Sequence, residues 1–253
     1  MRKNEILVSY GKSDVGKVRR RNEDSFKITE GDEWISAIVC DGMGGARGGE
    51  IASELAVCVY ADTLFKEIGK SGEGLSGQII KASMLSAVNE ANRSVWQRAN
   101  SDEAFNGMGT TLVAVFVWKD KAFAVNIGDS RLYSFCKGKL EQITKDHSFV
   151  QFLLDNGKIS LEEAKNHPNK NVITRALGIG STVDADFFMI DKFDGLLLCS
   201  DGLINYASPD ELTAVIESDI SVKNKVKNMI SAAKNGGGGD NITAVLLMKE
   251  GKK

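Results

Sequence analysis

The chain has 253 residues, 26% of them charged, and a formal net charge of -2 at pH 7. This near-neutral balance gives no electrostatic reason to bind nucleic acid or an anionic membrane. With 42% hydrophobic residues the chain can form a large core, and the short apolar stretch at residues 6–8 predicts neither a signal peptide nor a membrane span.

The cysteines are far apart and lie in apolar segments, without the paired spacing of a zinc site. They are Cys40, Cys58, Cys136 and Cys199. Such cysteines are most simply small core residues of a reduced protein, so we expect a cytoplasmic location.

The N-terminal half predicts two blocks of strands separated by a pair of helices. In chain order these are strands at 25–28 and 34–40, helices at 50–68 and 78–99 around a loop at 69–77, and strands at 110–118, 122–127, 131–135 and 140–143. We expect the last four to be consecutive antiparallel strands, with turns at 119–120 and 137–138.

The pattern changes after Asp146, where short helical pieces at 149–156 and 161–166 indicate an insertion or flap. The remaining elements are strands at 184–190 and 196–200, helices at 209–217 and 222–234, and a last strand at 242–248. Segregated blocks of strands and helices favour an α+β fold, in which helices cover the outer faces of packed antiparallel sheets. No linker divides the chain, which predicts a single domain over residues 1–249.

Acidic residues recur where apolar strands begin or end. Asp41 and Asp201 each follow an apolar strand and precede a glycine, whereas Asp240 comes just before the last strand. Three further acids flank strands: Glu23, Asp24 and Asp129. Any one Asp-Gly pair is more simply a turn, but the repetition predicts a metal centre. Oxygen ligands without histidine or cysteine suit Mg²⁺ or Mn²⁺ rather than zinc or copper.

Two glycine-rich segments, 41–45 and 107–111, lack the spacing and the lysine of nucleotide-binding loops. Glycines after Asp41 allow a backbone carbonyl to approach an ion, and the second segment is expected to be a tight entry into a strand. Within the basic run at 17–21, which is otherwise a solvated surface, we single out Arg19. It lies four residues before Glu23, and its guanidinium could hold two phosphate oxygens.

Nucleophilic catalysis by a side chain is not expected. Six residues separate Cys40 from Arg47, one too many for a Cys-x5-Arg phosphate loop. His147 could approach the site from the flap, but it is more simply a surface or capping residue.

The motifs together resemble the PP2C (PPM) family of metal-dependent serine/threonine phosphatases, and above all its short bacterial members that oppose Hanks-type (PASTA) kinases. They occur in the order of the family: Arg19 with residues 22–25, then residues 41–45, 107–111, 128–131, 200–203 and 239–243. The resemblance implies a four-layer αββα sandwich with a flap at about residues 146–174.

The resemblance also implies roles for individual residues. Asp41 would bridge two metals, the Gly42 carbonyl would bind one of them, and Asp201 and Asp240 would bind the other. Glu23 would act through a metal-bound water, with Asp24 supporting it from behind. Asp129 would share a third metal with Asp201, and Arg19 would bind the phosphate. The catalytic residues would thus be Arg19, Asp41 and Asp201.

One position departs from eukaryotic relatives, which often carry a histidine that is proposed to protonate the leaving alkoxide. Here the residue is Met43, and a thioether cannot donate a proton. We therefore expect a metal-bound water to serve as the general acid.

The expected activity is hydrolysis of phosphoserine and phosphothreonine in proteins, including a Hanks-type kinase and its substrates, by a monomer with two or three Mn²⁺ or Mg²⁺ ions. Two rival hypotheses use the same scaffold: a phosphatase dedicated to one regulatory protein, such as a sigma-factor antagonist, and a silent binding protein. A metal-binding module without catalysis is a third, and it leaves Arg19 without a purpose.

Overall fold

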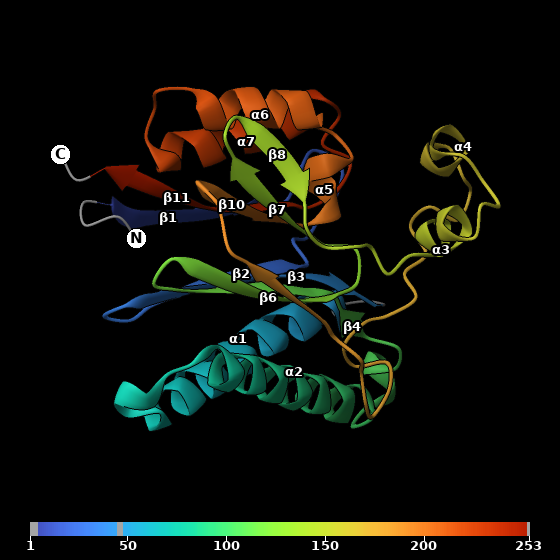
Figure 1. Ribbon diagram of the computed structural model, residues 1–253. Helices are drawn as coiled ribbons and strands as arrows, with labels where there is room; N and C mark the ends of the chain where they lie inside the picture. Colours follow the sequence, from blue (N-terminus) through green and yellow to red (C-terminus); the bar gives the residue numbers. More distant parts are fainter. Residues whose placement is uncertain (1–4, 45–47, 252–253) are drawn as a thin grey trace.

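The computed structural model describes residues 5–44 and 48–251. Two antiparallel sheets lie face to face, with the long helices α1 and α2 under one sheet and the helices α6 and α7 over the other (Figure 1). The predicted α+β fold with four αββα layers is therefore confirmed.

Each sheet is assembled from strands that are distant in sequence. One sheet has the order β1 (Glu5–Asp14), β11 (Ile242–Gly251), β10 (Gly195–Cys199), β7 (Arg131–Cys136) and β8 (Lys139–Gln142). The other has the order β2 (Asp24–Glu30), β3 (Trp34–Met43), β5 (Leu112–Trp118), β6 (Lys121–Ile127) and β9 (Asp186–Ile190), and the short β4 (Gly109–Thr110) pairs with the end of β3.

The strand alternation divides the apolar residues between three cores. On β10, Leu196 and Leu198 point into the layer between the sheets, whereas Leu197 points toward the helices. On β3, Val39 lies between the sheets and Ile38 packs against α1 and α2. Because a strand buried on both faces has no polar side, these segments read as continuous apolar runs in the sequence.

Most of the helices begin at a serine that caps them. They are α1 (Gly48–Lys70), α2 (Gly77–Ala99), α3 (Phe149–Asp155), α4 (Leu161–Lys165), α5 (Asp201–Ile204), α6 (Pro209–Glu217) and α7 (Val222–Asn235), with 3₁₀ turns at Gly72–Gly74 and Glu103–Phe105. Ser208 caps α6 in a capping box with Glu211, and Ser76 and Ser221 cap α2 and α7.

Three sequence expectations need correction. Strand β1 was not predicted, because an edge strand with partly exposed residues lacks a strong apolar pattern, although it pairs with β11 over its whole length. The expected run of four consecutive strands is wrong, since β5 and β6 belong to one sheet and β7 and β8 to the other. The expected strand at 110–118 is interrupted at Thr111, between β4 and β5.

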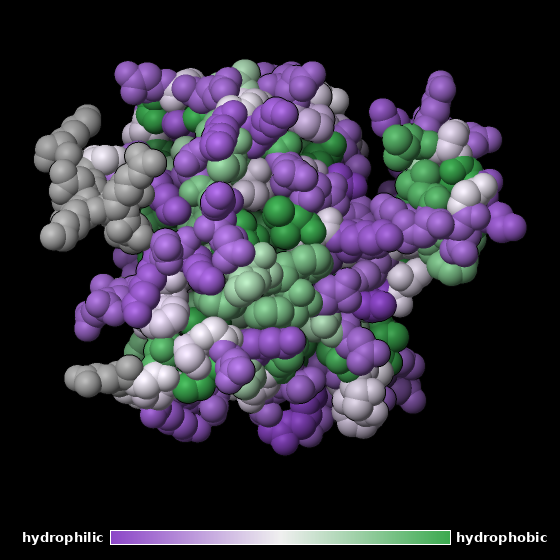
Figure 2. All heavy atoms as spheres, viewed as in Figure 1, coloured by the Kyte–Doolittle hydropathy of each residue, from purple (hydrophilic) through white to green (hydrophobic). Residues whose placement is uncertain are grey.

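Helices α3 and α4 form a lobe that stands away from the sheets (Figure 1). Figure 2 shows this lobe as a separate mass joined to the body by hydrophilic residues, with hydrophobic residues on its own surface. No residue of α3 is buried, and α4 buries only Ala164. The lobe is therefore anchored mainly through the segments at its base, where Ser148 pairs with Ile173.

None of the helices in the described residues is both long enough and apolar enough to span a membrane.

Candidate active site

A cavity of about 260 Å³ lies at one end of the two sheets. It is lined by Arg19, Glu23, Asp41, Gly42, Met43, Gly44, Thr111, Asp129, Asn171, Ile173, Asp201, Asp240 and Asn241. Every residue that the sequence predicted as a metal ligand or a phosphate ligand is in this lining. Asp24, predicted to support Glu23, lies buried behind it. Two members of the quoted motifs, Gly45 and Arg47, are outside the described residues.

Asp41 is fixed by its backbone. It pairs with Asp24 in the β2–β3 ladder, and its carbonyl oxygen accepts hydrogen bonds from the Thr111 amide (2.9 Å) and the Thr110 hydroxyl (2.9 Å). Its amide donates to the Thr111 hydroxyl at 2.9 Å. The interruption between β4 and β5 thus serves the site, because it turns Thr111 toward Asp41.

The glycines near Asp41 permit close approach of oxygen atoms. A Cβ at Gly42 would lie 2.0 Å from the Gly49 carbonyl oxygen, which no side chain tolerates. A Cβ at Gly49 would lie 2.7 Å from Glu23 Oε1 and 2.8 Å from the Gly42 carbonyl oxygen. The Glu23 carboxylate and the Gly42 carbonyl therefore approach the same small space.

Asp24 joins the two sheets. Its Oδ2 accepts hydrogen bonds from the hydroxyls of Ser200 and Thr243, both at 2.7 Å, from β10's end and from β11. Its Oδ1 is buried and has no hydrogen-bond partner among the described residues. Burial raises the pKa of Asp24 to about 7. The hydrogen bonds from Ser200 and Thr243 lower this pKa, whereas repulsion from the Asp201 carboxylate raises it further.

Asp201 and Asp240 are brought together by neighbouring strands, β10 and β11. Asp201 is the first residue of α5 and accepts a hydrogen bond from the Asn205 amide at 3.1 Å. A Cβ at Gly202 would lie 1.8 Å from the Asn241 carbonyl oxygen, so a glycine is needed where α5 meets the start of β11.

Arg19 reaches the site from the loop between β1 and β2. Its Nε and one terminal nitrogen contact the two oxygens of Asp240, both at 2.9 Å. About half of the Arg19 side chain is exposed, at 51%. Its guanidinium therefore lies at the mouth of the cavity, next to Asp240 and open to solvent.

Asn241 holds this loop in place. Its side-chain oxygen accepts from the Glu23 amide at 2.8 Å, and its amide nitrogen donates to the carbonyls of Val15 (3.0 Å) and Arg21 (2.8 Å). One buried side chain thus fixes the loop that carries both Arg19 and Glu23.

Asp129 occupies the turn where the chain crosses from one sheet to the other, between β6 and β7. Gly128 before it has a φ of +99°, a conformation that favours glycine. Ser130 after it shares a hydrogen bond of 2.7 Å with the Thr111 hydroxyl, which in turn bonds to the Asp41 amide. Burial raises the pKa of Asp129 to about 7, and repulsion from Asp201 adds to it.

The pKa shifts of the acids have a common cause. Burial raises the pKa of Asp201 to about 6, assisted by Asp240, and it raises the pKa of Asp41 well above its usual range, assisted by Asp24 and Asp201. Burial also raises the pKa of Glu23. Five lining residues are acids and one is an arginine. The cavity therefore has an excess of negative charge that a cation would relieve.

Within residues 5–44 and 48–251, no three acidic, histidine or cysteine side chains form a finished set of metal ligands. Asp240 instead gives both oxygens to Arg19, and Asp201 bonds to Asn205. The residues still fit a divalent cation: their donors are oxygens, their negative charge exceeds that of the single arginine, and Asp24 Oδ1, behind the cavity, is buried without a partner among the described residues.

The comparisons agree with this geometry. A family model described as protein phosphatase 2C matches residues 16–235. The chain belongs to the protein phosphatase 2C family. It is 40% identical over 248 residues to the serine/threonine phosphatase Stp of Listeria welshimeri, covering 95% of this chain and 97% of that protein.

Solved structures of this family superimpose on nearly the whole chain. The Streptococcus agalactiae serine/threonine phosphatase has a TM-score of 0.88 at 31% identity, covering 97% of this chain and all (100%) of that one. The catalytic domain of the phosphatase PstP, solved with 2 manganese ions, has a TM-score of 0.82 at 33% identity, covering 97% and 99%.

Some residues that build the site were missed from the sequence. Thr111 lies in a segment that was predicted only as a strand entry, yet its hydroxyl positions Asp41. Ser200, Thr243 and Asn241 stand beside the predicted acids, but their bonds cross between loops and sheets, which local patterns do not reveal. His147, expected as a surface or capping residue or as one that approaches the site from the flap, is only 8% exposed, and its Nδ1 accepts a hydrogen bond from the Gly128 amide at 3.1 Å.

Proposed function

We propose that this protein is a metal-dependent serine/threonine protein phosphatase, which hydrolyses phosphoserine and phosphothreonine in other proteins. One observation carries the proposal: acids from the ends of β3, β6, β10 and β11 line one cavity, with an arginine at its mouth. A mouth with an exposed guanidinium suits a phosphate group, and an acid-lined interior suits cations.

Asp41, Gly42, Asp201 and Asp240 would hold two divalent ions, with Glu23 next to the Gly42 carbonyl. Asp129 and Asp201 would hold a third. When bound, Mn²⁺ or Mg²⁺ supplies Lewis-acid chemistry, which neutralises phosphoryl charge and lowers the pKa of water. Asp24 would keep Asp41 and the other sheet in register through its bonds to Ser200 and Thr243.

Arg19 would bind two equatorial oxygens of the phosphate. The P–O bond to serine or threonine breaks as the attacking water bonds to phosphorus on the opposite side, and the leaving oxygen takes up a proton. Met43 lines the cavity where a donor would be useful, but a thioether has no proton to give. We therefore propose water as the source of this proton.

A cysteine mechanism does not fit. Cys40 is fully buried at 0% exposure, and burial raises the pKa of its thiol well above the ordinary value. A nucleophilic cysteine needs exposure and a lowered pKa. Replacing Cys40 by serine should leave phosphate release nearly intact, and a complete loss in a folded variant would favour a covalent mechanism.

The substrates would include a Hanks-type kinase and the proteins it phosphorylates, and the enzyme would act as a cytoplasmic monomer. The relatives support the activity, since they include the serine/threonine phosphatase Stp and the protein phosphatase PhpP. The acid set supports catalysis over a silent scaffold, because a binding protein does not require so many half-buried carboxylates in one cavity.

The decisive experiment measures phosphate release from a phosphothreonine peptide after EDTA treatment, with and without added Mn²⁺ or Mg²⁺. We expect no release after EDTA and recovery with either ion, and little release from the matched phosphotyrosine peptide. Full activity in EDTA would contradict a metal-dependent mechanism. Metal binding without any hydrolysis would instead identify a silent scaffold.

A further inference from the structure

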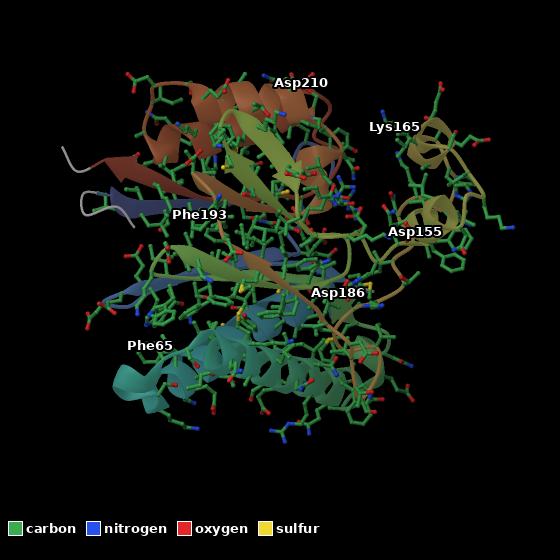
Figure 3. All side chains as sticks on the ribbon, viewed as in Figure 1. Phe65, Asp155, Lys165, Asp186, Phe193 and Asp210 are labelled. Atoms are coloured by element: carbon green, nitrogen blue, oxygen red, sulfur yellow. The ribbon has the colours of Figure 1, made fainter. Side chains whose placement is uncertain are left out.

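A second hollow, of about 810 Å³, adjoins the acid-lined cavity between the flap and the α5–α6 region. It shares the lining residues Asp129, Asn171 and Asp201 with that cavity, so the two are adjacent. Figure 3 shows Lys165 on α4 and Asp155 at the end of α3, both on the lobe that forms one side of this hollow. At its base lie Arg131 and Asp146.

Arg131 is held by Asp146 in a bidentate pair. Its Nε donates to Asp146 Oδ1 at 2.9 Å, and one terminal nitrogen donates to Oδ2 at 2.7 Å. The other terminal nitrogen donates to the Tyr133 hydroxyl at 3.0 Å. Gln142 also donates to Asp146, at 3.1 Å. The side chains of Arg131 and Asp146 are 27% and 11% exposed, so the pair is largely shielded from water.

Arg131 also lies close to two of the acids assigned to the metals. It is two residues after Asp129 on β7, and it pairs in register with Cys199, two residues before Asp201. The positive charge of Arg131 lowers the pKa of both Asp129 and Asp201, although burial outweighs this effect. The guanidinium therefore has two possible sets of anionic partners.

We propose that Asp146 is a positioning residue for the metal centre: by binding Arg131 in a bidentate pair, it keeps that guanidinium from pairing with Asp129 and Asp201. This inference rests on the proposed function, because it assumes that those two carboxylates bind a divalent ion. A guanidinium in contact with them would occupy the oxygens and the negative charge that the ion needs.

The geometry favours Asp146 as the stabilising partner. A planar guanidinium and a carboxylate match best when two parallel N–H···O bonds form, and here they do. Removing the charge of Asp146 would leave the Arg131 guanidinium, which is shielded from water, without an anionic partner. This state is unfavourable, and pairing with other carboxylates nearby would stabilise the guanidinium. Asp129 and Asp201 line the same hollow as Arg131 and are the two such carboxylates whose pKa values its charge lowers.

The test measures Mn²⁺ binding by isothermal titration calorimetry on three variants of the whole protein. Asp146→Asn retains the size of the side chain and removes its charge, so we expect the weakest Mn²⁺ site to lose affinity by roughly tenfold. The double variant Asp146→Asn/Arg131→Gln removes the released cation as well and should bind Mn²⁺ within about twofold of the wild type. Asp155→Asn removes an equal charge from the flap, away from the cavity, and should not change binding.

Unchanged Mn²⁺ affinity in Asp146→Asn would overturn the inference. An equal loss in the single and the double variant would also overturn it, because the defect would then be a distortion of the flap base and not the released cation. If Asp146→Asn does not fold, Mn²⁺ binding is measured on Arg131→Lys instead. This variant keeps the positive charge on a flexible side chain that cannot form the bidentate pair with Asp146. Weaker binding is expected there, and wild-type binding would contradict the proposal.

The same titration separates this inference from the proposed function. If the wild type itself does not bind Mn²⁺, the metal-dependent activity fails. If the wild type binds Mn²⁺ and hydrolyses the phosphothreonine peptide, the function stands whatever the variants show.

Discussion

The floor of the cavity and the flap are held in place in opposite ways. The floor is built from strand ends of both sheets, where Asp24 bonds to hydroxyls across the interface and Thr111 bonds to the Asp41 backbone. The flap carries α3 and α4 with almost no buried residue, and Leu161 on α4 is 74% exposed.

The two regions meet different structural requirements, one for fixed positions of the carboxylates and one for a variable surface. Metal chemistry needs carboxylates held in fixed positions, and a packed sheet supplies that order at the cost of burying like charges. An exposed lobe can change in sequence without loss of the fold, and we propose that this one meets the protein substrates. The contacts at the flap base, where Asp146 and His147 meet Arg131 and Gly128, join the two regions.

The largest effect should come from the floor. Asp41→Asn should reduce the rate of phosphate release by at least about 10³-fold, because it removes the charge that would bridge two cations. The folded state of the metal-free variant should be as stable as the wild type or more so, since repulsion with Asp24 and Asp201 is relieved. Steady-state kinetics and thermal unfolding measure both. Asp210→Asn, on the exposed start of α6 (Figure 3), is the control.

The second largest contrast should be in the effect of side-chain truncation on the free energy of unfolding, between the packed core of the sheets and the flap. Leu196→Ala removes a fully buried side chain between the sheets and should lower the free energy of unfolding by about 2–5 kcal/mol. Leu161→Ala on the flap should change it by less than about 0.5 kcal/mol. Urea denaturation of both variants measures the contrast, and equal losses would show that the flap shares the core's stability.

Arg19 should have an intermediate effect. Arg19→Lys keeps the charge but loses the planar fork, so kcat/KM for a phosphothreonine peptide should fall by roughly 10- to 100-fold. Arg20→Lys, in the same exposed loop, is the matched control and should retain wild-type kinetics. If both variants were equally active, Arg19 would not be the phosphate ligand.

The smallest effect should appear at the flap base as a pH dependence. Burial lowers the pKa of His147, and its Nδ1 must be unprotonated to accept from the Gly128 amide. In the unfolded chain, His147 takes up a proton near pH 6.5, whereas in the folded protein it does so only at lower pH. The free energy of unfolding should therefore decline as the pH falls from about 7.5 to 5.5, by less than about 1 kcal/mol, as measured by urea denaturation at both pH values.

Asparagine at this position tests that account. His147→Asn keeps an acceptor for the Gly128 amide but does not titrate, so the difference in unfolding free energy between the two pH values should become smaller. The nearby charges of Arg175, Asp186 and Asp146 remain in both proteins, which isolates the imidazole. Figure 3 shows Asp186 close to the segments that lead into the flap.

Much of this molecule could be predicted from the sequence, because its acids stand at the ends of strong apolar strands. All the α-helices except the short α5, most strands and the layer order followed from periodicity and blocks. The crossing from β6 to β7 between sheets did not, since a strand has the same local pattern in either sheet. Nor did β1, whose edge position leaves it half exposed.

The grouping of the charged residues was predictable to a similar degree, since the acids and Arg19 singled out in the sequence line one cavity. The neutral groups that orient them were not predicted, because the role of the Ser200 hydroxyl depends on a carboxylate 176 positions away in the chain. The burial of His147 was missed for the same reason: its partner Gly128 lies in a turn that only the tertiary structure brings near.

The bonds from Asp24 to Ser200 and Thr243 have a mechanical consequence. Dispersion contacts between apolar faces have no preferred direction, so they fix the relative position of two sheets less specifically than hydrogen bonds do. The Asp24 carboxylate accepts two hydrogen bonds from hydroxyls of the other sheet, and these directional bonds oppose sliding of one sheet over the other next to the cavity. These bonds therefore help to fix the spacing of the carboxylates that we propose as ion ligands, because those carboxylates come from both sheets.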